Sequence, residues 1–243
     1  MDPKLKLKII GTSGFTPFKS RTAKLFTSCR IFFGAKSLQI DIGNPYRGLP
    51  VDYLIITHTH YDHIQALNSL PIEFPTSSQV EVLIPSLTFM EEVKAKNPMI
   101  ERIRVFKTKI RLDGLSVQPF NVLHSSTTLT YGLKFHWGSK SMVWVPDWCV
   151  IPDLIGAISG ADYLFLGAAA MKKPISHKGF GHCQGAVFGM LEKISKMKNP
   201  PKKIYLIHFG MGLRPIAVKT RFLQKSFPKL NIDSTHDNMR IDL

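Results

Sequence analysis

One stretch of the chain, residues 54–70, constrains the fold and the function more than any other. It reads LIITHTHYDHIQALNSL. The β-forming residues 53–56 predict a short buried strand. The apolar spacing of Ile64, Ala66, Leu67 and Leu70 predicts one side of a helix. Between the two predicted elements lie four chemically active side chains: His58, His60, Asp62 and His63. The sequence therefore places them at a strand-to-helix turn.

Three imidazoles and a carboxylate are the nitrogen and oxygen donors that a borderline cation such as zinc prefers. His58 and His60 are two residues apart on an extended segment, so their side chains point to the same side and can share one metal. Asp62 and His63 follow where the chain turns and can reach a second metal. The alternative is a set of surface or core histidines without a metal. We favour the metal site, because buried histidines and aspartates must be paired and few other partners are near.

The motif HTHYDH (residues 58–63) matches the HxHxDH signature of the metallo-β-lactamase-fold hydrolases, and the chain resembles this superfamily from its first predicted strand to its last. The resemblance implies an α/β fold, a four-layer αββα sandwich with a two-metal site at the edge between its sheets. Members hydrolyse lactams, thioesters, lactones and phosphodiesters, so the fold alone does not name a substrate.

Composition fits one domain. The 243 residues, 44% of them hydrophobic, can bury a core as a single domain over residues 1–243. No apolar run is long enough to span a membrane, and the N-terminus lacks the features of a signal peptide. Cys29, Cys149 and Cys183 are too few and odd in number for a disulfide framework. A cytoplasmic protein is expected.

The net charge is +15, from 32 Lys and Arg against 17 Asp and Glu. This charge suggests a polyanionic partner such as RNA or DNA, although a basic surface also serves solubility alone, and we weigh the two evenly. Arg102, Arg104, Lys109 and Arg111 alternate with aliphatic residues, which predicts a strand with one cationic face and a slip near residues 106–108. We favour a solvated face there over a rail for a phosphate backbone.

The resemblance supplies the remaining metal ligands. His124, at the end of a predicted strand, takes the place of the family's third imidazole; Asp147 takes that of the bridging carboxylate; and His208 takes that of the final histidine. One metal would then be held by His58, His60, His124 and Asp147, and the other by Asp62, His63, His208 and Asp147. Asp41 would support the metal loop through hydrogen bonds. Pro146 and Trp148 depart from the family pattern around Asp147, so the shape of the neighbouring pocket stays open.

The opening GTSG (residues 11–14), with Pro17 and Arg21, resembles the phosphodiesterase branch, which includes ribonuclease Z and the small cyclic phosphodiesterases. These relatives carry a histidine near the scissile phosphate at the start of a helix. His182, before a helix predicted from Cys183 to Met197, matches that position, and His177 is its competitor. The glutamate that ribonuclease Z carries after the strand over 161–166 is replaced here by the neutral residues 167–170. No counterpart of its long RNA-holding arm is evident, which favours a smaller substrate.

Together these features predict a hydrolase with two divalent cations, zinc or alternatively manganese, acting on a phosphodiester in RNA, DNA or a cyclic nucleotide. Asp62 would orient the attacking hydroxide, and His182 would protonate the leaving oxygen. One alternative is a hydrolase of a lactone, thioester or other small ester. A second is a non-enzymatic nucleic-acid-binding protein with a structural metal site. A homo-oligomer is compatible with the sequence.

Overall fold

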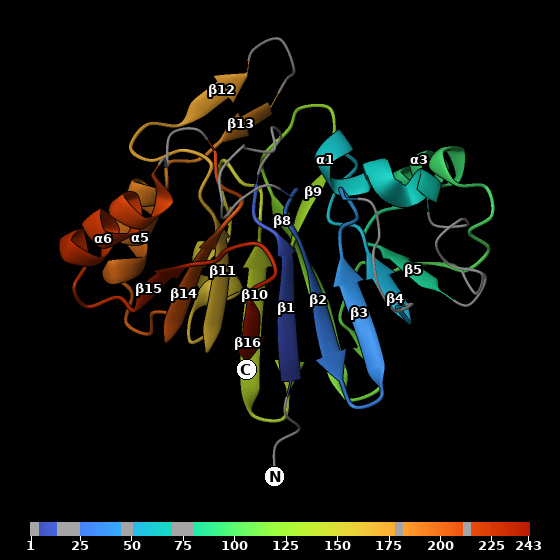
Figure 1. The fold of residues 1–243 in the computed structure, drawn as a ribbon, viewed down its shortest axis with the longest axis horizontal. Coiled ribbons are helices and arrows are strands. Elements are labelled where there is room, and N and C mark those ends of the chain that lie inside the picture. Colours follow the sequence, from blue (N-terminus) through green and yellow to red (C-terminus); the bar gives the residue numbers. More distant parts are fainter. Residues whose placement is uncertain (1–4, 14–24, 45–50, 70–79, 178–181, 211–214) are drawn as a thin grey trace.

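The structure is a computed structural model. It describes residues 5–13, 25–44, 51–69, 80–177, 182–210 and 215–243, and for residues 69, 175–177 and 182 it describes the backbone alone. Figure 1 shows the chain viewed along its shortest axis.

Two seven-stranded sheets form the centre of the molecule. The first contains, in spatial order, β16 (Arg240–Asp242), β1 (Leu5–Gly11), β2 (Ser28–Phe33), β3 (Lys36–Ile40), β4 (Tyr53–Ile55), β5 (Glu81–Ile84) and β6 (Ile103–Val105). The second contains β15 (Ile232–Ser234), β14 (Lys203–Ile207), β11 (Tyr163–Gly167), β10 (Lys140–Val145), β9 (Thr130–Trp137), β8 (Leu115–Val122) and β7 (Ile110–Leu112). Each sheet is mixed: β3 to β6 run parallel in the first, and β10, β11, β14 and β15 run parallel in the second.

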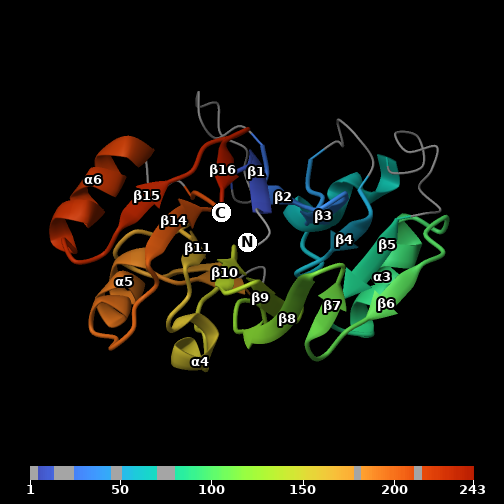
Figure 2. The same ribbon diagram turned by 90° about the horizontal axis from the view of Figure 1, so that it is seen from below.

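Helices cover the outer face of each sheet, as Figures 1 and 2 show. On the first sheet lie α1 (Tyr61–Ile64), the 3₁₀ helix η1 (Gln65–Ser69) and α3 (Thr88–Lys96), and on the second lie α4 (Leu154–Ile158), α5 (Val187–Ser195) and α6 (Ile216–Ser226). Buried apolar side chains accordingly form three clusters. One joins α1, η1 and α3 to the first sheet, one lies between the sheets around Trp144 and Phe135, and one joins α5 and α6 to the second sheet. This is the αββα sandwich that the family resemblance implied.

The basic strand predicted over residues 102–112 is wrong as a single strand. Residues 103–105 form β6 at the edge of the first sheet, whereas residues 110–112 form β7 at the edge of the second. The slip predicted near residues 106–108 is the crossing between the two sheets. Phe106 is buried there among the side chains between the sheets, so an apolar residue at this point redirects the chain.

The helix predicted from Cys183 to Met197 begins later, at Val187. Residues 182–184 form β13 (His182–Gln184), which pairs antiparallel with β12 (Ile175–His177) in a small ribbon above the sandwich. The sequence analysis also missed α4 and β15. Both are short. Asp153 precedes α4 as its N-cap, and its carboxylate accepts a hydrogen bond from the Gly156 backbone N–H at 2.9 Å.

Among the described residues, no helix combines the length and the apolar character needed to cross a membrane.

Candidate metal centre

The motif over residues 58–63 lies where β4 ends and α1 begins. Thr57 to His60 form the connecting loop, and Asp62 and His63 lie on α1. The side chains of His58, Asp62 and His63 are all buried, while His60 is half-buried. The predicted strand-to-turn-to-helix arrangement is therefore present, with a shorter α-helix than the sequence suggested.

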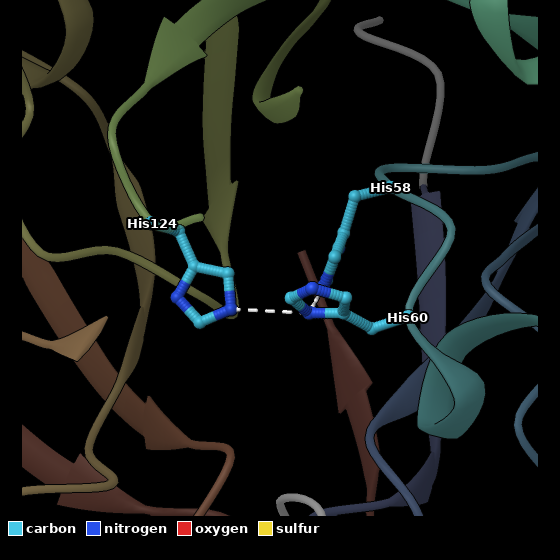
Figure 3. A group of neighbouring side chains, drawn as sticks. All are labelled: His58, His60 and His124. Atoms are coloured by element: carbon cyan, nitrogen blue, oxygen red, sulfur yellow. Dashed lines mark hydrogen bonds between the residues drawn. The ribbon is translucent and has the colours of Figure 1, made fainter. Parts of the chain in front are cut away.

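A first cluster consists of three imidazoles. His58 Nε2 lies 3.1 Å from His60 Nδ1, and His60 Nδ1 lies 3.3 Å from His124 Nε2. His124 follows β8 of the second sheet, so it approaches from the opposite side (Figure 3). Three ring nitrogens converge on one point, and they lie within 4.8 Å of one another, as the ligands of a single cation do.

A second cluster consists of Asp62, His63 and His208, whose ligand atoms also lie within 4.8 Å of one another. His208 follows β14 and is held in the left-handed region at φ 52°. Such a conformation is uncommon outside glycine and persists where the surrounding structure demands it.

Asp147, which follows β10, lies between the two clusters. Its Oδ1 atom is 3.0 Å from His208 Nε2 and 3.7 Å from His124 Nε2. Its Oδ2 atom is 2.9 Å from His63 Nε2. The structure thus brings all seven predicted ligand residues to one place, with one carboxylate in contact with both groups.

The outer nitrogens of four histidines are tied to the protein, and the partners fix the tautomers. His124 Nδ1 donates to the Cys183 carbonyl at 2.7 Å, and His63 Nδ1 donates to Asp41 Oδ2 at 2.8 Å. His58 Nδ1 lies 3.1 Å from Thr57 Oγ1, and that hydroxyl already donates to Asp41 at 2.8 Å.

His208 Nδ1 lies 3.1 Å from Thr27 Oγ1, and this hydroxyl in turn donates to the Ser13 carbonyl at 2.9 Å. Both threonine hydroxyls are therefore acceptors toward the imidazoles. Each of the four rings carries its proton on Nδ1 and turns Nε2 inward. This is how proteins prepare histidines to bind a metal.

Asp41 occupies the supporting position that the sequence suggested. Its backbone is left-handed (φ 56°), and its carboxylate accepts hydrogen bonds from Thr57 N at 2.8 Å and from His63. One buried carboxylate therefore orients the loop that begins the motif and the helix that ends it.

The residues fit a bound metal on one further ground. His63 Nε2 and Asp147 Oδ2 are fully buried and, among the described residues, neither makes a hydrogen bond of acceptable geometry. Buried polar atoms without a hydrogen-bond partner are costly and rare. A cation at this point would satisfy both atoms together.

Charge at the centre follows from burial and from neighbours. Burial and the positive charge on His63 lower the pKa of His58, and burial and His124 lower the pKa of His60 to about 4. Burial would lower the pKa of His63 as well, but the carboxylates of Asp41 and Asp62 outweigh it and raise that pKa. Burial would raise the pKa of Asp147, but the charges of His208 and His124 lower it.

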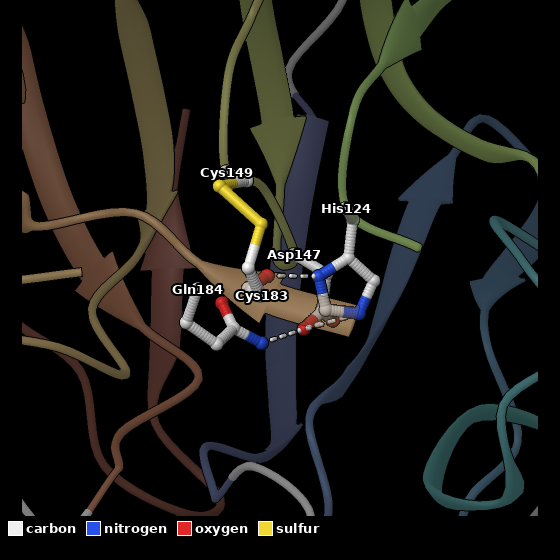
Figure 4. The surroundings of a disulfide bond; sticks show 5 residues. All are labelled: His124, Asp147, Cys149, Cys183 and Gln184. Atoms are coloured by element: carbon white, nitrogen blue, oxygen red, sulfur yellow. Dashed lines mark hydrogen bonds and ion pairs between the residues drawn. A yellow bond between two sulfur atoms is a disulfide. The ribbon is translucent and has the colours of Figure 1, made fainter. Parts of the chain in front are cut away.

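Three parts of the site were missed by sequence reasoning. Gln184 donates a short hydrogen bond from Nε2 to Asp147 Oδ1, and Cys149 and Cys183 form a disulfide beside it (Figure 4). Thr27 supports His208. None of these residues belongs to a recognisable motif. Closeness in sequence to Asp147 and His182 could have drawn attention to Cys149, Cys183 and Gln184, whereas Thr27 had no such signal.

The departure at Trp148 has a structural explanation. Its ring is buried against Gly185, where an added Cβ would collide with the indole, and its Nε1 donates to the Gly167 carbonyl at 2.9 Å. The indole therefore contacts Gly185 on one hand and the first residue of the neutral loop over 167–170 on the other.

His177 and His182 are the two candidates for the general acid. They lie opposite each other in the β12–β13 ribbon, where their backbones are paired. Their side chains lie outside the described residues, as do Gly14, Pro17 and Arg21, so the choice between them stays a prediction.

Comparison with protein families now places the chain. The profile described as "Beta-lactamase superfamily domain" matches residues 38–209, a span that contains all seven candidate ligands. The chain belongs to this superfamily. It has the fold of the superfamily and the histidine and aspartate clusters of a metal-dependent hydrolase. A search of curated proteins gave no match.

Solved structures agree on the superfamily fold. The metallo-β-lactamase fold protein YhfI from Bacillus subtilis is 16% identical, with full coverage of both chains and a TM-score of 0.79. Zn²⁺-bound PqqB from Methylobacterium extorquens is 15% identical over 98% of this chain and 100% of its own, with a TM-score of 0.73. A diphosphatase from the PhnP family is 20% identical over 98% of both chains, with a TM-score of 0.72. At these identities the likeness concerns the fold and leaves the branch of the superfamily open.

Proposed function

We propose that this protein is a two-metal phosphodiesterase that hydrolyses RNA, DNA or a cyclic nucleotide. The position of Asp147 is the observation that carries the proposal, because its oxygens lie 2.9 Å from His63 Nε2 and 3.0 Å from His208 Nε2, with His124 Nε2 at 3.7 Å. A carboxylate in contact with both clusters sets two cation sites side by side, as two-metal hydrolases require.

In this proposal the two sites share Asp147. The first adds His58, His60 and His124, and the second adds Asp62, His63 and His208. Imidazole and carboxylate ligands suit zinc, with manganese as the alternative, and the similar PqqB structure is Zn²⁺-bound. Divalent cations held there supply Lewis acidity, which makes a water deprotonate near neutral pH and offsets the negative charge that builds up on phosphoryl oxygens.

The chain's own residues complete the chemistry. Asp62, at the start of α1, is an acceptor that would orient the attacking oxygen toward phosphorus. His182 would give its proton to the leaving oxygen. Asp41, Thr57 and Thr27 hold the imidazoles in their Nδ1–H tautomers, so that the inner nitrogens need no rearrangement.

Two observations favour an anionic phosphodiester over a neutral ester. The net charge of +15 attracts polyanions, and the neutral loop over 167–170 adds no carboxylate that would repel a phosphate. A similar fold also serves as a diphosphatase in the PhnP family.

The test is a parallel assay of the metal-loaded protein against bis-p-nitrophenyl phosphate, cyclic nucleotides, single-stranded nucleic acids and a lactone. We expect phosphodiester turnover that disappears when the metal is chelated and in Asp62→Ala. Asp242→Ala, an exposed carboxylate on β16, is the matched control and should retain full activity. Turnover of the lactone with none of the phosphodiesters would overturn the proposed substrate class.

A further inference from the structure

Two half-buried cysteines lie next to the metal centre, on different segments. Cys149 is two residues beyond Asp147, and Cys183 lies in β13 next to Gln184. Their disulfide spans 34 residues of sequence, and the two Cα atoms are 5.6 Å apart. The mechanism proposed above uses neither thiol, so the pair needs an explanation of its own.

Both cysteines are bound through their backbones to the segment that carries His124. The Cys183 carbonyl accepts the Nδ1 proton of His124 at 2.7 Å, and Cys183 N donates to the His124 carbonyl at 2.8 Å. Cys149 N donates to the carbonyl of the preceding residue, Leu123, at 2.6 Å. The disulfide therefore closes a junction of three segments around one candidate ligand.

The same junction holds Asp147. Gln184, the neighbour of Cys183, donates to Asp147 Oδ1. Gly185 N donates to the carbonyl of Trp148 at 2.6 Å, between Asp147 and Cys149 in sequence. Figure 4 shows His124, Asp147 and Gln184 gathered beside the sulfur–sulfur bond. Opening that bond would remove the covalent tie between β13 and the Asp147 loop, and hydrogen bonds alone would then position the two candidate ligands.

We propose that Cys149 and Cys183 are a thiol–disulfide modification site that sets the metal affinity of the centre. The proposal rests on the metal site of the proposed function. In the oxidised form the crosslink fixes His124 and Asp147 for the first cluster. A dithiol reductant passes two electrons and two protons to the bond, which yields two cysteine thiols and the disulfide of the reductant. The half-buried positions of both residues leave the bond within reach of such a reductant.

The two clusters should respond unequally. In the second cluster, the Nδ1 atoms of His63 and His208 are held by Asp41 and Thr27, which belong to other segments than the two cysteines. Reduction should therefore lower the affinity for the cation at His58, His60 and His124 more than the affinity for the cation at the second cluster. Loss of partners that orient metal ligands typically costs about 10–100-fold in metal affinity.

The experiment measures zinc binding by competition with a chromophoric chelator, for protein held oxidised and for protein reduced with a water-soluble phosphine. We expect two zinc ions per oxidised chain, and an affinity about tenfold or more lower for one of them after reduction. The variant Cys149→Ser/Cys183→Ser should show the weaker affinity with or without the phosphine, which separates the thiols from any effect of the phosphine on zinc. Circular dichroism of each form checks the fold.

Equal affinities in the two redox states would overturn the switch while leaving the metal site intact. Unfolding on reduction would also overturn it, because the disulfide would then serve overall stability. A rise in affinity with thiolate-to-metal absorption in the cobalt-loaded protein would show that the freed thiols bind the metal themselves, and would overturn it too. Absence of zinc from both states would instead refute the proposed function.

Discussion

The two sides of the metal centre are built in different ways. On the first-sheet side, His58, His60, Asp62 and His63 fall within six consecutive residues, and Asp41 from the end of the neighbouring strand β3 supports them. On the second-sheet side, His124, Asp147 and His208 follow β8, β10 and β14, three strands that the chain forms far apart in sequence. Their supports come from still other segments.

This difference separates local from long-range organisation. The spacing in HTHYDH sets the direction of each side chain once the strand and the helix form on either side. The second side has no such local rule, because each ligand is placed by pairing within the sheet and by contacts that cross the molecule. Its supports are a carbonyl from β13, the amide of Gln184, the hydroxyl of Thr27 and a disulfide. We expect the first side to depend strongly on its one charged support, Asp41, and the second side to spread its dependence over several weaker supports.

The largest effect should come from the residue that joins the two sides. Asp147→Ala should lose most of the bound metal and nearly all hydrolysis, because the two clusters would no longer share a carboxylate. Elemental analysis of the purified variant and a bis-p-nitrophenyl phosphate assay measure the two losses. About two ions per chain are expected in the unmodified protein. Full metal content with full activity in the variant would remove the joining role of Asp147.

A large effect on rate alone is expected on the second side, at the β12–β13 ribbon. His182→Ala should retain its metal and lose about 10²–10⁴-fold in kcat, as the loss of a general acid does. The deficit should shrink for p-nitrophenolate, a leaving group that needs little protonation. His177→Ala is the matched variant from the paired position, and if it alone shows this pattern, the acid is His177.

The contrast between the two sides also explains what the sequence could predict. The strand-to-helix turn around the HxHxDH motif was predicted from the residues themselves, because local spacing and apolar periodicity determine it, whereas the sandwich was implied by the family resemblance. The family resemblance added His124, Asp147 and His208, but not their supports. Gln184 and Thr27 carry no signal in one sequence, since a lone amide or hydroxyl is common anywhere. The pairing of Cys149 with Cys183 depends on a junction of three distant segments.

The break between β6 and β7 was missed for a related reason. Alternating charge continues through residues 102–112, and the alternation is the same whether one edge strand or two carry it. Only the burial of Phe106 between the sheets shows that the chain changes sheet. The β12–β13 ribbon is too short for periodicity to distinguish it from the start of α5.

A moderate effect should compare the supports of the two sides directly. Asp41→Asn keeps a residue that tolerates the left-handed backbone but removes the charge that receives His63 and Thr57. Gln184→Met keeps the size of the side chain and removes its donor to Asp147. We expect zinc affinity to fall by about 10–100-fold for Asp41→Asn and by less for Gln184→Met.

Zinc titration of both variants in competition with a chelator measures these two losses of affinity. The order follows because Asp147 retains its contacts with three histidines when Gln184 is changed, whereas Asp41 is the charged partner of His63. The reverse order would mean that the long-range side depends on a single amide more than the local side depends on Asp41.

A smaller effect concerns pH in the metal-free protein. The lowered pKa values of His58 and His60 mean that the unfolded chain binds more protons, so stability should fall as pH drops from 6.5 toward 4. The raised pKa of His63 acts oppositely, with stability lost as pH rises above 6.5 through that pKa. Thermal unfolding of metal-free protein across this range should show the acid decline. His60→Gln, which has no titrating ring, should flatten it, and an unchanged slope would contradict the assignment to His60.

The smallest effect concerns the basic residues at the two sheet edges. Arg104 lies in β6 and Arg102 directly precedes it. Arg111 lies in β7 and Lys109 directly precedes it, so the two pairs of basic residues belong to different sheets. Arg104 is already paired with Glu81 at 3.0 Å, while Lys109 and Arg111 are exposed. If these edges bind nucleic acid, Lys109→Gln/Arg111→Gln should reduce the salt dependence of oligonucleotide binding more than Arg102→Gln/Arg104→Gln does. The reason is that a basic side chain already paired with a carboxylate neutralises a phosphate less fully, so the nucleic acid releases fewer of its counterions. Turnover of a small phosphodiester should be the same in both double variants.

We expect the difference in salt dependence between the two double variants to be slight, because exposed alternating charge is also how a sheet edge avoids pairing with another chain. Salt slopes that neither pair changes would assign these residues to that protective role, and the basic partner surface would then have to lie on another face.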